Sequence, residues 1–162
     1  MIHPFRTLHR VKKLREDRAL AAMQEARRAV EAAEGRVRAA EEAVAESERT
    51  LPAREAAIYA EIMRQIVSVP AIDGAKERVQ RLMEEHQRLI DKAMRAKDHL
   101  ERMRAALTEA REEYGRRRAE TEKIETMTEE LAAEMAAEAQ AAEEAEIEDL
   151  FSRPRARPGD AA

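Results

Sequence analysis

Residues 19–44, ALAAMQEARRAVEAAEGRVRAAEEAV, decide the fold of this chain. Larger apolar side chains recur here every seven residues, and an alanine stands four residues before each of them. A seven-residue spacing places both series on one face of an α-helix, which is the pattern of a coiled coil. The larger series keeps its phase beyond the quoted stretch, and its members are Met23, Val30, Val37, Val44, Leu51 and Ile58.

The second half of the chain carries the same heptad spacing, and the two halves meet at a turn. One series runs from Val79 to Tyr114 and the other from Leu82 to Leu131. Between the halves lies VSVPAIDGAKERV, residues 67–79, where Ser68 is a good N-cap for a second helix and Pro70 falls in its tolerated first turn. Asp73 is the alternative cap.

These patterns predict an all-α protein, a long two-helix antiparallel coiled-coil hairpin with a longer second helix. The first helix is expected over about 5–66, the turn over about 67–69 and the second helix over about 69–150. Residues 151–162, which contain SRPRARPGDAA, are expected to form a disordered tail.

Folding the chain at residue 70 predicts which side chains meet. Ile58 then faces Leu82 and Leu51 faces Leu89, while His86, a polar residue at a core position that helps to fix the register, lies opposite Arg54. A slip of one heptad keeps the same core positions, so the register stays open.

Pro52 interrupts the first helical pattern. Proline removes one helical hydrogen bond and crowds the preceding turn, at a cost of ~3 kcal/mol in a helix interior. We expect a kink around residues 48–52, with Thr50 as a candidate cap of a new helix. The heptad phase continues from Val44 to Ile58, which favours a kink over a break.

Composition excludes several classes of protein. Of the 162 residues 40% are charged, 2% are aromatic and none is cysteine, which argues against a compact sheet fold and against disulfides or cysteine-based sites. The net charge of -4 argues against general nucleic-acid binding. No apolar run suits a membrane span or a signal peptide, so an intracellular protein is expected. We find no catalytic, metal-binding, cofactor-binding or nucleotide-binding pattern, and expect no enzymatic activity.

The charges are segregated along the chain. The first helix begins with a basic segment, whereas residues 129–149 carry nine carboxylates and no lysine or arginine. An antiparallel fold brings these segments together, with Arg10 opposite Glu130, and leaves about 135–150 as a single acidic helix. The basic face could serve this pairing alone or bind an acidic partner. Apolar residues around the turn could likewise close the hairpin, dock a partner, or both.

Three stretches resemble the YscO/FliJ family of type III secretion stalk proteins, the YscO branch more closely than the flagellar one. Residues 12–19, KKLREDRA, are similar to the segment that opens the family's first helix. Residues 54–62, REAAIYAEI, with 67–69 and 75–79, are similar to the region around its turn. The resemblance covers roughly residues 5–130.

The resemblance implies a non-enzymatic cytoplasmic stalk at the base of a secretion apparatus. The end with both termini would insert into the hexameric export ATPase, the tip would point to the export gate, and secretion chaperones would bind. No cofactor, nucleic acid or membrane insertion is implied. By position in this architecture the ring-facing residues would be Arg6, Arg10, Lys13, Arg15 and Arg18, and the gate-facing residues Ile66, Val67, Val69 and Ile72.

Other functions compete with this interpretation. The first is a generic coiled-coil scaffold or chaperone unrelated to secretion. A peripheral membrane helix protein is a second, although the acidic segment at 129–149 argues against it. A regulatory subunit of another rotary ATPase is a third.

Overall fold

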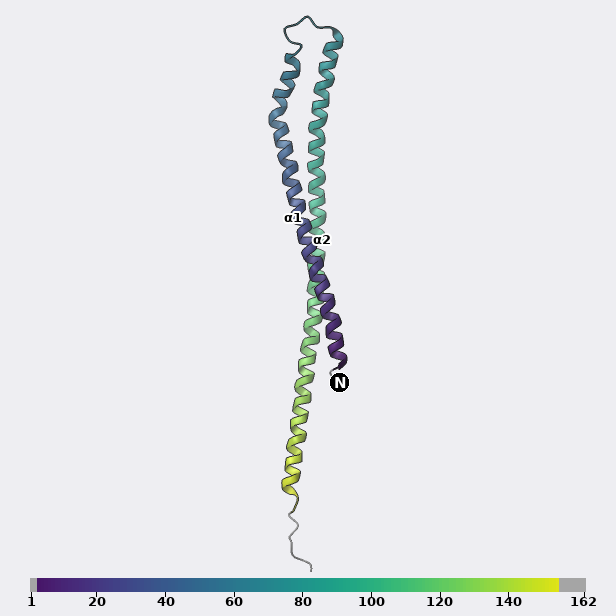
Figure 1. The fold of residues 1–162 in the computed structure, drawn as a ribbon, viewed down its shortest axis with the longest axis vertical. Coiled ribbons are helices and arrows are strands. Elements are labelled where there is room, and N and C mark those ends of the chain that lie inside the picture. Colours follow the sequence, from purple (N-terminus) through teal and green to yellow (C-terminus); the bar gives the residue numbers. More distant parts are fainter. Residues whose placement is uncertain (1–2, 155–162) are drawn as a thin grey trace, which may run out of the picture. The chain divides into compact units, whose positions relative to one another are not determined.

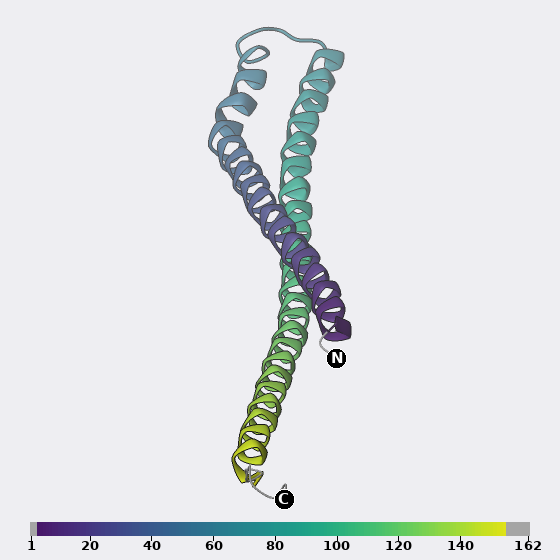
Figure 2. The same ribbon diagram turned by 60° about the horizontal axis from the view of Figure 1, so that its bottom comes forward.

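The computed structural model describes residues 3–154, and within them the chain forms two helices and no strand. Helix α1 spans His3–Ala60 and helix α2 spans Val69–Ser152, each as one continuous ribbon in Figures 1 and 2. The all-α class, the helical hairpin and the longer second helix are therefore confirmed. Of the predicted disordered tail, residues 151 and 152 are helical, and residues 155–162 lie outside the described part of the chain.

The chain divides into two compact parts, which we describe separately. The hairpin part comprises residues 20–113 and contains the turn, whereas the terminal part, over the described residues, comprises 3–19 and 114–154. In each part a stretch of α1 packs antiparallel to a stretch of α2. The two parts differ in what fills the seam between the helices.

The seam of the hairpin part is apolar and thin. One core cluster contains Val30, Ala33, Leu100 and Leu107, with Met23, Val37 and Met103 packed against it. Ala33 is only 1% exposed, because a small side chain lets the facing helix approach closely. A second cluster lies nearer the turn and contains Ile58, Ala75, Val79 and Leu82. Alanine on one helix thus meets larger side chains on the other, which lets two helices fill a seam with almost no aromatic residue.

One contact of the seam lies a heptad away from the predicted register, whereas the predicted neighbours Ile58 and Leu82 do share a core cluster. Nδ1 of His86 lies 2.8 Å from Oγ of Ser47, seven residues before the expected partner Arg54. Arg54 instead pairs with Glu85 at the edge of the seam, and Leu51 packs against the cluster that contains Leu82. The core positions are unchanged because a shift of seven residues preserves the heptad phase.

The shift follows from where α1 ends. The helix stops at Ala60, six residues before the predicted Ile66, and residues 61–68 form the connection. The amides of Ile62 and Met63 donate to the carbonyl of Tyr59, and Arg64 takes the left-handed conformation with φ 84°. Such a residue ends a helix by turning the chain away from its axis. The hairpin is therefore centred nearer residue 65 than residue 70.

Helix α2 begins as the sequence indicates. The carbonyl of Ser68 accepts hydrogen bonds from the amides of Ala71 and Ile72, which places Ser68 at the cap and Pro70 in the first turn. Pro70 has no amide hydrogen to donate, and the first turn of a helix requires none.

Pro52 does not break α1. The helix runs through it to Ala60. Thr50 does not cap a new helix, because its hydroxyl donates 3.0 Å back to the carbonyl of Glu46, as threonines do inside a helix. Packing of Leu51 and Ile58 on the same cluster holds both sides of the proline in one helix.

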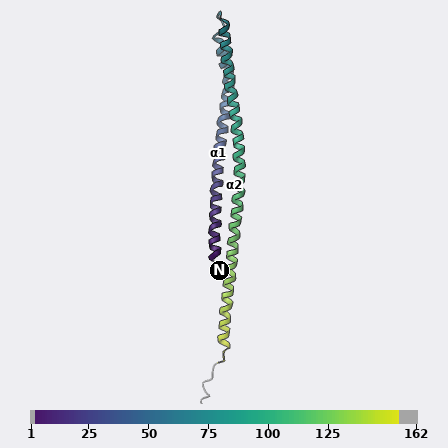
Figure 3. The same ribbon diagram turned by 90° about the vertical axis from the view of Figure 1, so that its right-hand side faces the viewer.

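The terminal part has a short, polar seam. Its buried side chains include the polar residues Glu16 and Thr121 beside Ala19 and Ile124. Helix α2 continues past the first residue of α1, as the green-to-yellow ribbon shows (Figures 1 and 3). Every side chain from 132 to 152 is exposed, and we call this segment the acidic overhang. It matches the single acidic helix expected from the sequence.

Candidate interaction surfaces

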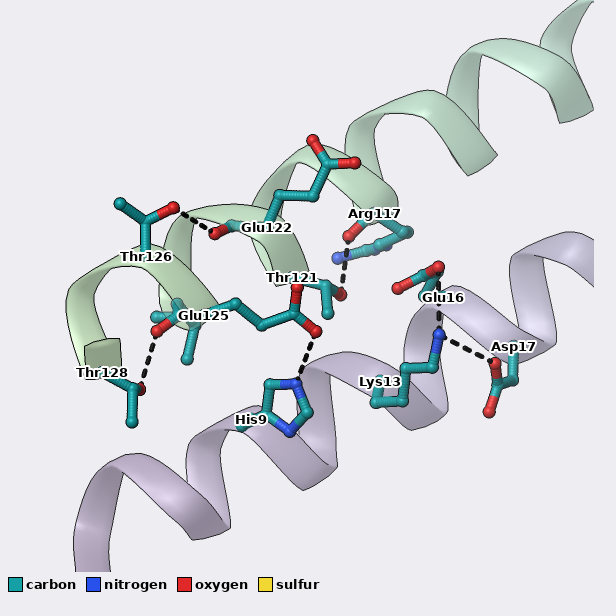
Figure 4. A network of polar contacts seen from close by, with 11 residues as sticks. His9, Lys13, Glu16, Asp17, Arg117, Thr121, Glu122, Glu125, Thr126 and Thr128 are labelled. Atoms are coloured by element: carbon teal, nitrogen blue, oxygen red, sulfur yellow. Dashed lines mark hydrogen bonds and ion pairs between the residues drawn. The ribbon is translucent and has the colours of Figure 1, made fainter. Parts of the chain in front are cut away.

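Two polar contacts join the basic start of α1 to α2. Nε2 of His9 lies 2.9 Å from Oε1 of Glu125 (Figure 4), and Nζ of Lys12 donates 2.9 Å to Oε2 of Glu120. Thr121 lies between the two pairs on α2, with its hydroxyl donating to the carbonyl of Arg117. The first helix is therefore joined to α2 near its start by polar contacts.

Two ionisable side chains near this seam are shifted by their neighbours. The hydrogen bond from Lys12 lowers the pKa of the Glu120 carboxyl below its usual range. On α1, Glu16 accepts a hydrogen bond from Lys13 at 3.3 Å and raises the pKa of that ammonium (Figure 4). Asp17 adds a second, longer contact of 3.8 Å with Lys13. Both shifts stabilise the charged forms at neutral pH.

A groove of about 770 Å³ runs along this end between α1 and α2. Helix α1 supplies most of its basic lining, and α2 contributes Glu125, Thr128, Glu129 and Ala132 on the other side. The residues of α1 in the groove are Arg6, His9, Arg10, Lys13, Leu14 and Asp17.

All five residues that the family architecture assigned to the ring-facing end are exposed. Arg6, Arg10 and Lys13 line the groove, whereas Arg15 and Arg18 are exposed outside it. The predicted pairing of Arg10 with Glu130 is not among the ion pairs of residues 3–154. The side chain that contacts a carboxylate on the facing helix at this level is the imidazole of His9.

The four residues assigned to the tip lie on both sides of the connection. Ile66 is fully exposed and Val69 is 70% exposed, whereas Val67 is half-buried and Ile72 is only just exposed. Met63, which is also exposed, enlarges this apolar surface. Below the tip, Arg78 donates 2.6 Å to Glu61 and lowers the pKa of that carboxyl, which ties the two helix ends together.

Sequence reasoning missed an apolar group at the end of the acidic overhang. Ile147, Leu150 and Phe151 are all exposed, and their spacing of three and four residues places them on one side of α2. This spacing was present in the sequence, but the density of carboxylates around it concealed the pattern. Leu14, also exposed, is the corresponding missed residue in the groove.

Over the described residues, neither helix is long and apolar enough to cross a membrane. The same residues contain no group of three or more histidine, aspartate or glutamate side chains arranged to hold a metal ion.

Comparison with known proteins identifies the family. The model of the family "Type III secretion protein YscO" matches residues 5–153. The crystal structure of the type III secretion protein YscO from Vibrio parahaemolyticus shares 24% sequence identity, with 91% of this chain and 93% of that chain covered and a TM-score of 0.83, and so has the same fold. No curated protein sequence matches the chain. Because the family model spans nearly all of the helical sequence, this chain belongs to the YscO family of type III secretion proteins.

Proposed function

We propose that this chain is a non-enzymatic stalk and adaptor that acts at the cytoplasmic base of a type III secretion system. It would insert its terminal end into the hexameric export ATPase, direct its turn towards the export gate and bind secretion chaperones. The observation that supports this most is membership of the YscO family over residues 5–153. The form of the molecule agrees, since a stalk needs helix length and charged surfaces rather than a catalytic pocket.

The basic start of α1 is the proposed contact with the ring. Arg6, Arg10, Arg15 and Arg18 are exposed and have no ion-pair partner among residues 3–154, so their charges are available to a partner. Exposed cations of this kind contribute more to the rate and specificity of association than to folding. The ring should therefore present carboxylates to this end.

The turn is the proposed contact with the gate. Ile66 and Val69 are exposed on a connection between two helices, where neither contributes to the apolar core. Exposed apolar side chains grouped at one end of a protein are typical of a docking surface.

Binding to the purified cognate export ATPase tests the first contact. The wild-type chain should co-elute with the hexamer and stimulate its ATP hydrolysis. The double variant R6E/R10E should weaken binding about tenfold at moderate salt, because two attractive contacts become repulsive. The matched control R36E/R38E makes the same charge change at exposed positions of α1 outside the basic start.

Either of two results would count against the proposal. One is a wild-type chain that neither binds nor stimulates the ATPase. The other is equal loss of binding in the two double variants, which would indicate a response to overall charge. Chaperone binding is tested separately, by co-precipitation of this chain with each chaperone of the same system.

A further inference from the structure

We propose that two copies of this chain form a two-fold dimer in which the acidic overhang of each copy lies in the groove of the other. This goes beyond the stalk role and does not rest on it. The dimer follows from four features of the terminal part: an unpartnered helix, a complementary groove, a shared heptad register and matching lengths.

The acidic overhang is a helix without a partner. Its side chains are exposed all around, and its apolar residues Ile147, Leu150 and Phe151 face solvent. Its carboxylates also gather towards the carboxyl end of α2, where negative charge is unfavourable against the helix dipole. Most helical stability in proteins comes from tertiary packing, and this segment has none within the described residues. A basic, partly apolar surface would relieve all three problems.

The groove offers such a surface. Arg6 and Arg10 line it and form no ion pair within residues 3–154, while both carboxylate partners of Lys13 lie on its own helix. Leu14, 51% exposed, supplies an apolar contact. The opposite wall carries Glu125, which His9 already engages, and Glu129, so the α1 wall is the one that attracts an acidic helix.

The heptad register brings complementary side chains to the same level. Ile147 follows Leu14 by 133 residues, a whole number of heptads, so the two residues occupy equivalent faces of their helices. With Leu14 beside Ile147 in a parallel pair, Arg10 comes level with Glu143 and Lys13 with Glu146. Arg6, at the edge, meets the small side chain of Ala139. One alignment therefore satisfies an apolar contact and two charge pairs.

A two-fold axis makes this contact twice. The partner's overhang runs parallel to α1 and therefore antiparallel to α2, which is how the two α2 helices lie around a two-fold axis perpendicular to them. At 1.5 Å per residue, residues 132–152 span about 30 Å and residues 3–19 about 25 Å, so the overhang fits the wall that it covers. Two equivalent grooves double the buried surface and close the assembly without further copies. Two overhangs packed only on each other would oppose seven carboxylates to seven.

The mass of the full chain in solution tests the dimer. Sedimentation equilibrium at about 100 µM should give a dimer at 50 mM NaCl and a monomer at 1 M NaCl, because screening weakens the charge pairs. The variant E143R/E146R should weaken dimerisation by about a hundredfold or more, since four attractive pairs become repulsive in each dimer.

Two further variants make the test specific. E134R/E148R changes the charge equally in the same overhang, but both residues lie on the side of the helix away from the groove, so the dimer should persist. R10E/K13E should dissociate the dimer. Combining it with E143R/E146R should restore dimerisation, because both members of each charge pair are then reversed and attract each other again. Circular dichroism checks that each variant keeps its helix content.

A wild-type chain that is monomeric at low salt overturns the proposal, as does a dimer that survives E143R/E146R. Equal dissociation of E134R/E148R and E143R/E146R would reduce the effect to net charge and also overturn it. The stalk proposal has separate consequences, because E143R/E146R leaves Arg6 and Arg10 unchanged for binding to the ATPase.

Discussion

A disulfide between positions 47 and 86 should form readily and stabilise the hairpin. The side chains of Ser47 and His86 touch across the seam, with Oγ and Nδ1 2.8 Å apart, and the chain has no cysteine of its own to interfere. The variant S47C/H86C should therefore oxidise within one molecule. The residues are 39 apart in sequence, and closing a loop of that length removes unfolded-state entropy equivalent to about 4 kcal/mol at 25 °C.

Thermal unfolding followed by circular dichroism measures the effect. The oxidised variant should melt roughly 10 °C or more above its reduced form. The control R54C/H86C places the cysteines as the other heptad register would require, and these should remain reduced under the same mild oxidant. Rapid oxidation of R54C/H86C together with failure of S47C/H86C would refute the observed register.

Three further predictions concern the stability of the two helices. Leu100→Ala should destabilise the chain by about 2–4 kcal/mol in urea unfolding, because Leu100 is only 7% exposed in the core cluster. The exposed control Leu14→Ala should change stability by less than about 0.5 kcal/mol. Equal effects would contradict the core assignment. Pro52→Ala should stabilise α1 by about 2–3 kcal/mol, because the proline is exposed and its replacement restores a helical hydrogen bond. A loss of stability would show that the proline has a packing role. Glu120→Gln should lower the melting temperature at pH 7. The difference from wild type should disappear as the pH falls through the lowered pKa of Glu120, because a carboxylate whose pKa is depressed in the folded state stabilises the fold only while it is ionised. A difference that persists at pH 2 would contradict the ion pair with Lys12.

The fold could be predicted from the sequence because heptad spacing alone identifies the core. Val30, Ala33, Leu100 and Leu107 recur at intervals that suit a helical seam, and all four are buried. The register could not be predicted with the same certainty, because a slip of seven residues buries the same side chains. It depended on the end of α1 at Ala60 and on the left-handed turn at Arg64, and no glycine or proline marks either position.

Of the candidate surfaces, the charged segments could be predicted from the sequence and the groove could not. The basic and acidic segments were evident from composition, and Arg6 and Arg10 prove to be exposed. The groove was not evident, because it arises from how α1 packs on α2 through His9 and Lys12.

The polarity of the stalk is the central claim of the proposed function, and site-specific photocrosslinking in the assembled secretion system tests it most directly. A photoreactive residue at position 10 should crosslink to the export ATPase, and one at position 66 should crosslink to the export gate protein. Crosslinks in the reverse order, or crosslinks of both positions to the same partner, would contradict the account.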